Sequence, residues 1–236
     1  MLEETISYDC DGIESEAFFA RPEGDGPFPG VMLAHAWMGV HDETRDKARA
    51  MAKAGYAAFC ADVYGKGNRA TDIPGAQALM NPLASDRGGA LARRLRASLA
   101  AFQSHASVDA TRVAAVGHCF GGLCVLDMVR MGADIRAAVS VHGILAAQSF
   151  DGAEPNAKVL ALHGYDDPMA PPDAMAAFCA EMTSFGLDWQ LHAFGGTQHA
   201  FTNPDAANDE LGLIYNESAA RRSQVMILEF LREVLA

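Results

Sequence analysis

A cysteine near the middle of the chain stands where a nucleophile could be displayed. The segment Gly117–Gly122 reads Gly-His-Cys-Phe-Gly-Gly, and it follows the apolar run Val113–Val116 and precedes an apolar, helix-like stretch. A strand that turns sharply into a helix, with glycines where side chains would collide, holds the middle residue in a strained conformation. The unpaired N–H groups and positive dipole end of that helix favour a thiolate. Cys119 is therefore the candidate nucleophile.

An acid and a histidine follow the cysteine, each after a strand-like segment. Asp166 and Asp167 come just after the apolar run Val159–Leu162, where a loop carries carboxylates to the C-terminal edge of a sheet. We favour Asp167 because a turn-setting proline follows it, while Asp166 remains the alternative and both could merely shape a turn. His199 lies beyond the strand-like Trp189–Phe194. The order nucleophile, acid, histidine is that of α/β-hydrolases.

Two backbone amides could stabilise the oxyanion of such a reaction. They are the N–H of Phe120, next to the nucleophile, and an N–H from the segment after the first apolar strand, where we choose Trp37. His118 and Phe201 flank the candidate residues and are possible substrate contacts. We expect no metal site, because neither an H-E-x-x-H motif nor another local ligand pair is present.

Composition excludes several classes of function. The net charge of −12, with 18 Lys and Arg against 30 Asp and Glu, argues against binding to nucleic acid or to an anionic membrane surface. The sequence shows neither a basic segment followed by an apolar stretch, as in a secretory signal, nor an apolar run of about 18 residues. We therefore expect a cytoplasmic protein. The five cysteines lack C-x-x-C spacing, which favours free thiols over a disulfide framework or a structural zinc site.

Strand and helix patterns alternate along most of the chain. Two extended segments, 5–8 and 15–20, precede strands at 30–35, 56–63, 112–116, 137–142, 159–163 and 189–194, with helices at 43–54, 87–104, 120–131, 175–185 and 218–234. A loop containing Pro74 and Pro82 precedes the second helix. The pattern predicts one α/β domain over residues 1–236, with a mostly parallel sheet covered by helices on both faces. Only about 15 residues separate the strands at 142 and 158, too few for a lid domain.

With these motifs in place, the chain resembles the dienelactone hydrolase family, a cysteine-dependent branch of the α/β-hydrolase fold. The resemblance runs from about Ser15 to the C-terminal helix and rests on four segments: 35–39, 117–122, 163–168 and 196–201. It implies that Cys119, Asp167 and His199 form a catalytic triad. It also implies hydrolysis of lactones and small carboxylic esters without a cofactor.

Two departures from the family pattern affect the substrate and the resting state. Ala36 stands where family members commonly have a glutamate that holds the resting thiol, so Cys119 could rest as a thiolate–imidazolium pair or be activated only by His199 and the helix terminus. The segment 200–204 lacks the arginine that binds a substrate carboxylate in dienelactone hydrolases proper. Arg87 could fill a second anion-holding position, or be surface charge at a helix start. Dienelactone itself therefore stays open as a substrate.

Two other classes of function remain as alternatives. One is a catalytically silent member of the fold that binds a small molecule. The other is a thiol redox sensor that uses Cys119, although Cys124 lies five residues away and so does not share its helix face. The sequence favours neither a monomer nor a homodimer.

Overall fold

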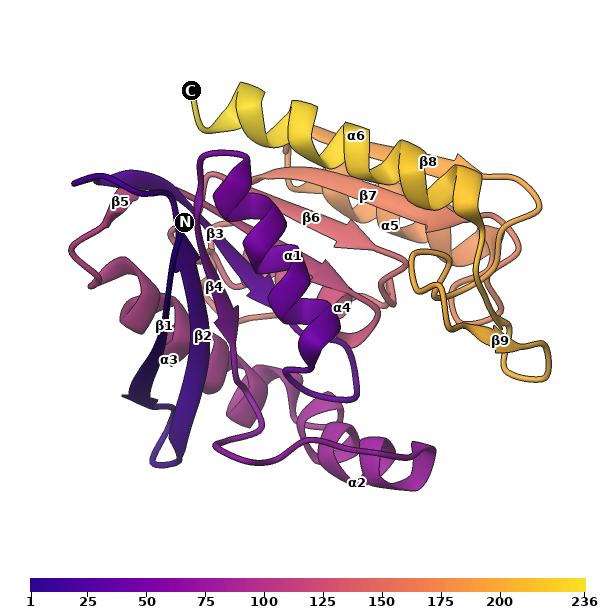
Figure 1. Cartoon of the computed structure of the whole chain (residues 1–236). Helices are drawn as coiled ribbons and strands as arrows, with labels where there is room; N and C mark the ends of the chain where they lie inside the picture. Colours follow the sequence, from indigo (N-terminus) through magenta and orange to yellow (C-terminus); the bar gives the residue numbers. More distant parts are fainter.

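The computed structural model describes residues 1–236 and contains one large mixed sheet. Its eight strands lie in the order β1-β2-β4-β3-β5-β6-β7-β8 (Figure 1). The strands are β1 (Leu2–Asp9), β2 (Glu14–Arg21), β3 (Phe28–Ala34), β4 (Ala57–Ala61), β5 (Val108–His118), β6 (Ala137–Val141), β7 (Lys158–Gly164) and β8 (Trp189–Phe194). β1 and β2 pair antiparallel, and the strands from β4 to β8 in the sheet order are all parallel. The expected α/β-hydrolase architecture is confirmed.

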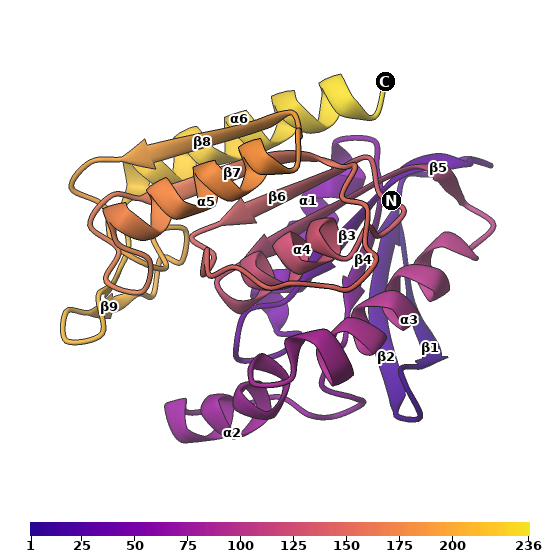
Figure 2. The same cartoon turned by 180° about the vertical axis from the view of Figure 1, so that it is seen from behind.

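Helices cover both faces of this sheet. α1 (Asp42–Lys53) and α6 (Glu217–Val234) lie on the face seen in Figure 1. The opposite face, seen in Figure 2, carries α3 (Ala92–Gln103), α4 (Phe120–Arg130) and α5 (Pro172–Ser184), with α2 (Ile73–Ala84) at the lower edge. The segment 143–157 between β6 and β7 forms no helix or strand, and no lid covers the sheet edge.

The central strands are apolar on both sides because each side faces a helical layer. In β5, Val113 and Ala115 pack into the core beneath α3 and α4, while Ala114 and Val116 pack into the core beneath α1 and α6. Successive side chains of a strand point to opposite faces, so a strand that is covered on both faces of the sheet needs apolar residues at every position. This explains the near-continuous apolar runs of the sequence.

The region between β4 and α3 differs from the sequence-based prediction. The predicted loop with Pro74 and Pro82 contains α2, because Asp72 caps the helix by accepting a hydrogen bond from the Gly75 N–H at 2.8 Å. Pro74 lies in the first turn, where a missing N–H costs nothing. The predicted helix at 87–104 is also divided, since Arg87–Leu91 form a π-helical turn, η1, before α3.

Smaller features complete the chain. Two short strands, β9 (Ala207–Asn208) and β10 (Leu213–Ile214), pair antiparallel between β8 and α6, and the sequence analysis missed them. All five cysteines are free thiols. None of the helices combines the length and the apolar character that crossing a bilayer requires.

Candidate active site

The turn between β5 and α4 displays Cys119 in a strained backbone conformation. Its φ of 56° and ψ of −117° lie outside the regions that ordinary side chains prefer, and Cys119 occupies the N-cap of α4. The close approach of backbone atoms at this turn explains the neighbouring glycines. A Cβ on Gly117 would lie 2.0 Å from the carbonyl oxygen of Gly121, and a Cβ on Gly121 would lie 2.1 Å from that of Ala34. The tight turn therefore requires glycine at both positions and leaves Cys119 only partly buried.

Asp167 and His199 are brought together at the ends of β7 and β8. The Nδ1–H of His199 donates to Oδ2 of Asp167 at 2.7 Å, and neither residue is more than 1% exposed. The second carboxylate oxygen accepts from the backbone N–H of Met169 at 2.8 Å, which fixes the orientation of the carboxylate. Asp166 is exposed instead. The geometry thus selects Asp167 from the two adjacent aspartates.

His199 carries a positive charge at neutral pH in this arrangement. Burial lowers the pKa of its imidazole, but the hydrogen bond that it donates to Asp167 and the nearby Cys119 side chain outweigh that effect and raise the pKa to about 10. Its Nε2 atom is buried and has no hydrogen-bond partner of normal geometry.

His142, at the end of β6, contacts both the nucleophile and the base. Its Nδ1 accepts a hydrogen bond from the backbone N–H of Cys119 at 3.2 Å, so its Nε2–H donates to Oγ1 of Thr202 at 2.8 Å. Burial, followed by the charge of His199, holds the pKa of His142 well below its usual value and keeps the ring neutral. The sequence analysis did not single out this residue. Its position at the end of the strand next to β5 was the available signal.

The segment after β3 is held so that one backbone amide stays free. The carbonyl oxygen of Ala36 accepts hydrogen bonds from Nδ1 of His35 at 2.7 Å and from the N–H of Gly39 at 3.1 Å. The Trp37 N–H belongs to the same trans peptide and points the opposite way, and it makes no hydrogen bond within the protein. The Phe120 N–H lies in the first turn of α4, where no intrahelical acceptor exists. Both predicted oxyanion donors are therefore available.

Arg87 and Phe201 have structural contacts instead of an open position beside the triad. The Arg87 guanidinium donates to the two carboxylate oxygens of Asp127, at 2.8 and 2.6 Å, and to the carbonyl oxygens of Ala146 and Ala147. Four of its five N–H donors are thus already used. Phe201 is completely buried, with its ring 5.2 Å from that of His142, which it supports.

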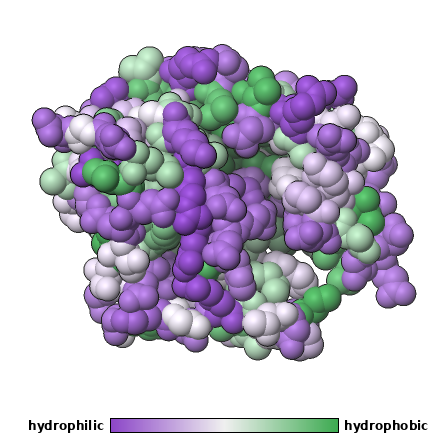
Figure 3. Space-filling view, in the orientation of Figure 1, coloured by the Kyte–Doolittle hydropathy of each residue, from purple (hydrophilic) through white to green (hydrophobic).

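His118 faces away from the reacting residues. It lines a cavity of about 580 Å³ between α1 and α6, and Cys119 does not line this cavity. In Figure 3 the surface over α1 is mainly hydrophilic, and the molecule is hollowed beside it. No group of three or more His, Cys, Asp or Glu side chains is arranged to hold a metal ion.

The known proteins that match this chain agree with its architecture. The family model described as "Dienelactone hydrolase family" matches residues 15–235, which is almost the whole chain. The chain belongs to the dienelactone hydrolase family. Within this family it is 27% identical, over 85% of its length and 86% of the relative's, to a probable 2-oxo-3-(5-oxofuran-2-ylidene)propanoate lactonase of Bradyrhizobium sp. It is 25% identical to a putative carboxymethylenebutenolidase of Escherichia coli, over 94% of this chain and 83% of the other.

Solved structures of the dienelactone hydrolase family show the same fold. A dienelactone hydrolase-like promiscuous phosphotriesterase from metagenomic libraries superposes with a TM-score of 0.93, at 30% identity, over 100% of this chain and 99% of the other. A putative dienelactone hydrolase from Klebsiella pneumoniae superposes with a TM-score of 0.80 at 26% identity, over 98% of each chain. The family resemblance predicted from the sequence is therefore confirmed.

Proposed function

We propose that this protein hydrolyses small carboxylic esters or lactones through a triad of Cys119, His199 and Asp167. The buried hydrogen bond between His199 and Asp167, at 2.7 Å, carries the proposal, because it orients the imidazole beside the strained cysteine. Family membership adds support, since the relatives named above include a probable lactonase and putative carboxymethylenebutenolidases.

The reaction begins from a thiolate–imidazolium pair. Because His199 is already protonated, it takes no proton from the thiol, and the sulfur of Cys119 attacks the ester carbonyl directly. The carbonyl oxygen becomes an oxyanion that accepts hydrogen bonds from the N–H groups of Phe120 and Trp37. The tetrahedral intermediate collapses, and the alkoxide or enolate that leaves takes the proton from Nε2 of His199.

A water molecule then releases the acid. Neutral His199 accepts a proton from water as the water oxygen attacks the thioester carbonyl, and the C–S bond breaks to return the thiolate of Cys119. Asp167 keeps the imidazole in one orientation through both halves of the cycle. This mechanism uses side chains and backbone amides of the chain itself, and it calls for no cofactor.

The surroundings of the triad favour small, uncharged substrates. No lid covers the sheet edge, which favours small substrates over long lipid chains. Arg87 is held by Asp127, and the segment 200–204 contains no basic residue that could bind a substrate carboxylate. We therefore propose uncharged esters and lactones in preference to dienelactone, which carries a carboxylate.

Phosphotriesters are a second candidate substrate class. The solved structure with a TM-score of 0.93 is described as a promiscuous phosphotriesterase, and it is 30% identical to this chain over its whole length. Attack of a thiolate on a phosphotriester also places negative charge on an oxygen, which the same two amides could stabilise. Hydrolysis of paraoxon, measured beside that of p-nitrophenyl acetate, tests this candidate.

A mutant series separates hydrolysis from the alternative functions. We expect wild-type protein to hydrolyse p-nitrophenyl acetate, and Cys119→Ala and His199→Ala to lose at least about 99% of that activity, because triad members act as a unit. Cys179→Ala removes another partly exposed thiol and serves as the matched control, with activity retained. Undiminished activity in Cys119→Ala contradicts the triad. Inactive wild-type protein favours a silent binding protein.

The redox alternative has a separate structural test. Cys124 is only 1% exposed, and burial holds the pKa of its thiol well above the usual value, so it is a poor resolving partner for Cys119. After peroxide treatment we expect mass spectrometry to detect no disulfide between these two residues. Its formation in folded protein that lacks esterase activity favours the redox function.

A further inference from the structure

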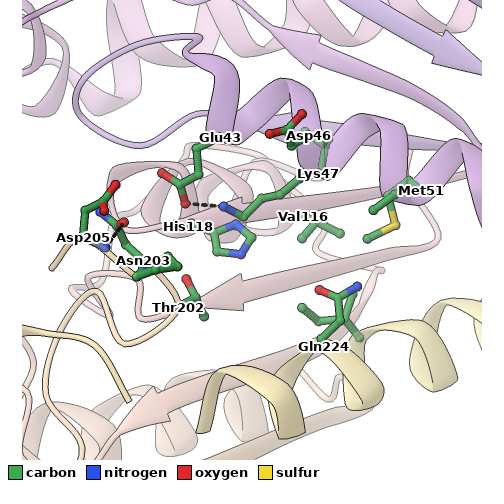
Figure 4. A pocket seen from close by; sticks show the side chains of 14 residues that line it. Glu43, Asp46, Lys47, Met51, Val116, His118, Thr202, Asn203, Asp205 and Gln224 are labelled. Carbon is green, nitrogen blue, oxygen red and sulfur yellow. Dashed lines mark hydrogen bonds and ion pairs between the residues drawn. The ribbon is translucent and has the colours of Figure 1, made fainter. Parts of the chain in front are cut away.

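A cavity between α1 and α6 lies apart from the proposed triad. It has a volume of about 580 Å³, within the size range of small-molecule sites. Figure 4 shows α1 on one side, α6 on the other, and the end of β5 on its floor. Neither Cys119, Asp167 nor His199 lines it. The proposed hydrolysis therefore does not explain this cavity.

His118 faces this cavity without a hydrogen-bond partner. Its side chain is only 9% exposed, makes no hydrogen bond with the protein, and lies near the centre of the view in Figure 4. Burial, with the Lys47 ammonium as a smaller cause, holds the pKa of His118 well below its usual value. A neutral imidazole offers one donor and one acceptor, and both ring nitrogens of His118 are accessible from the cavity, so a ligand there can hydrogen-bond to them.

Thr202 adds a second polar group to the same cavity. Its Oγ1 atom accepts the Nε2–H of His142, so the hydroxyl proton of Thr202 remains free to donate. Beside its charged residues, the lining includes aliphatic and neutral polar side chains, among them Leu33, Met51, Val116, Ile227, Asn203 and Gln224. The apolar body of a ligand could pack against the aliphatic residues while its polar group hydrogen-bonds to His118 and Thr202.

The charges around the cavity disfavour ligands of either sign. Three carboxylates line it, from Glu43, Asp46 and Asp205, and they repel an anion. The ammonium of Lys47 is bound to Glu43, so it is not free to neutralise one. A cation that bound His118 would in turn meet the ammonium of Lys47, which already disfavours a positive charge on that imidazole.

We propose that this cavity is a binding site for a small uncharged molecule with an apolar body and one hydroxyl or carbonyl group that hydrogen-bonds to His118 and Thr202. The site is separate from the proposed ester hydrolysis, because the catalytic candidates do not line it. Binding here and turnover at Cys119 can be measured independently.

Three aromatic probes of similar shape test the ligand class. 2-Phenylethanol is neutral, phenethylammonium is its cationic counterpart, and phenylacetate is anionic. Binding is followed by NMR of the ring nitrogens in protein labelled at histidine, with the His118 signals assigned by their loss in His118→Gln. We expect saturable shifts with 2-phenylethanol, and affinity at least about fivefold weaker for both ions, the effect of one unfavourable charge contact.

A matched pair of variants on α6 locates the binding site. Gln224 is exposed and lines the cavity, so Gln224→Trp should fill the opening, whereas Val225 is 56% exposed and does not line it. We expect Gln224→Trp to lose the His118 shifts and Val225→Trp to keep them, with both variants folded and equally active on p-nitrophenyl acetate. If the wild-type protein shows no esterase activity, the proposed hydrolysis is contradicted but this binding proposal is not, because the NMR signals of His118 report binding directly.

Other outcomes overturn the proposal. The absence of any saturable shift in wild-type protein indicates that only water fills the cavity. Equal or tighter binding of either charged probe contradicts the ligand class. Unchanged binding in Gln224→Trp contradicts the location of the site.

Discussion

The neutral ring of His142 stands edge-on to the charged ring of His199, with centroids 5.1 Å apart, and it accepts the backbone N–H of Cys119 at 3.2 Å. One side chain thus restrains both the nucleophile and its partner. His142 is itself at a φ of 39°, a left-handed conformation that is unusual outside glycine. Such strain is typical of residues whose surroundings fix them for function.

Replacing His142 tests this positioning role. His142→Phe keeps a ring but removes both nitrogens, so we expect kcat for p-nitrophenyl acetate to fall about tenfold, the effect of one lost hydrogen bond. The burst of p-nitrophenol reports acylation directly, and KM should change less than kcat. His192→Phe, on the edge strand β8, is the control and should behave as wild type. An unchanged burst rate in His142→Phe rules out the positioning role.

The raised pKa of His199 predicts a specific dependence of stability on pH. The unfolded imidazole titrates at about 6.5 and the folded one at about 10, so the folded state binds the proton more tightly. The resulting stabilisation is fully present below about pH 6.5 and is lost as the pH rises towards 10.

Urea unfolding of the wild type and of His199→Gln between pH 6 and 10 measures this effect. We expect the difference in the free energy of unfolding between the two proteins to change steadily across that window, to the disadvantage of the wild type as pH rises. A constant difference shows that His199 titrates normally in the folded protein. His105→Gln replaces a histidine outside the site and controls for general effects of the substitution.

A buried ion network explains the position of Arg87 and predicts a large stability change. Asp127 accepts from Arg87 and from Arg130, and the fully buried Arg130 also donates to both carboxylate oxygens of Glu181. Asp127→Ala leaves the Arg87 guanidinium without a carboxylate partner and Arg130 with Glu181 alone, so we expect unfolding to become easier by about 3–5 kcal/mol. Asp134→Ala is an exposed control with little effect. Chemical denaturation measures both, and similar midpoints for the two variants contradict the prediction.

The close approach at the elbow predicts that Gly121 cannot be replaced. In Gly121→Ala the new Cβ would lie 2.1 Å from the backbone oxygen of Ala34, and neither element can move without displacing the other. We expect a loss of about 1–3 kcal/mol in stability, as in overpacked cores, together with loss of ester hydrolysis.

Gly152→Ala provides the comparison for this variant. Gly152 also has a positive φ, 67°, but has no atom within 4 Å of an added Cβ, so only the local backbone strain of about 1–2 kcal/mol is expected. Its activity should remain. An active Gly121→Ala enzyme shows that the turn tolerates more space than the structure allows.

Sequence patterns predicted the sheet well because local signals were strong there. Apolar runs marked every parallel strand, and the order Cys119, Asp167, His199 followed the ends of β5, β7 and β8. The choice between Asp166 and Asp167 needed burial, which only the folded chain reveals. α2 was missed because a proline such as Pro74 is common both in loops and in the first turn of a helix.

Side-chain partners distant in the sequence were beyond local patterns. Arg87 meets Asp127 across 40 positions, and His142 meets Thr202 across 60. No local sequence pattern around either residue indicates these contacts. A basic residue at a helix start looks free for a ligand until its acidic partner is located in space.

The alternation along β5 has a consequence for how such a protein can change. Its last residue, His118, turns to the α1 and α6 layer, while the next position leaves the strand and carries the sulfur. Neighbours in the chain therefore belong to separate environments. Mutations that alter the layer around α1 and α6 can therefore accumulate while the geometry around Cys119 is preserved.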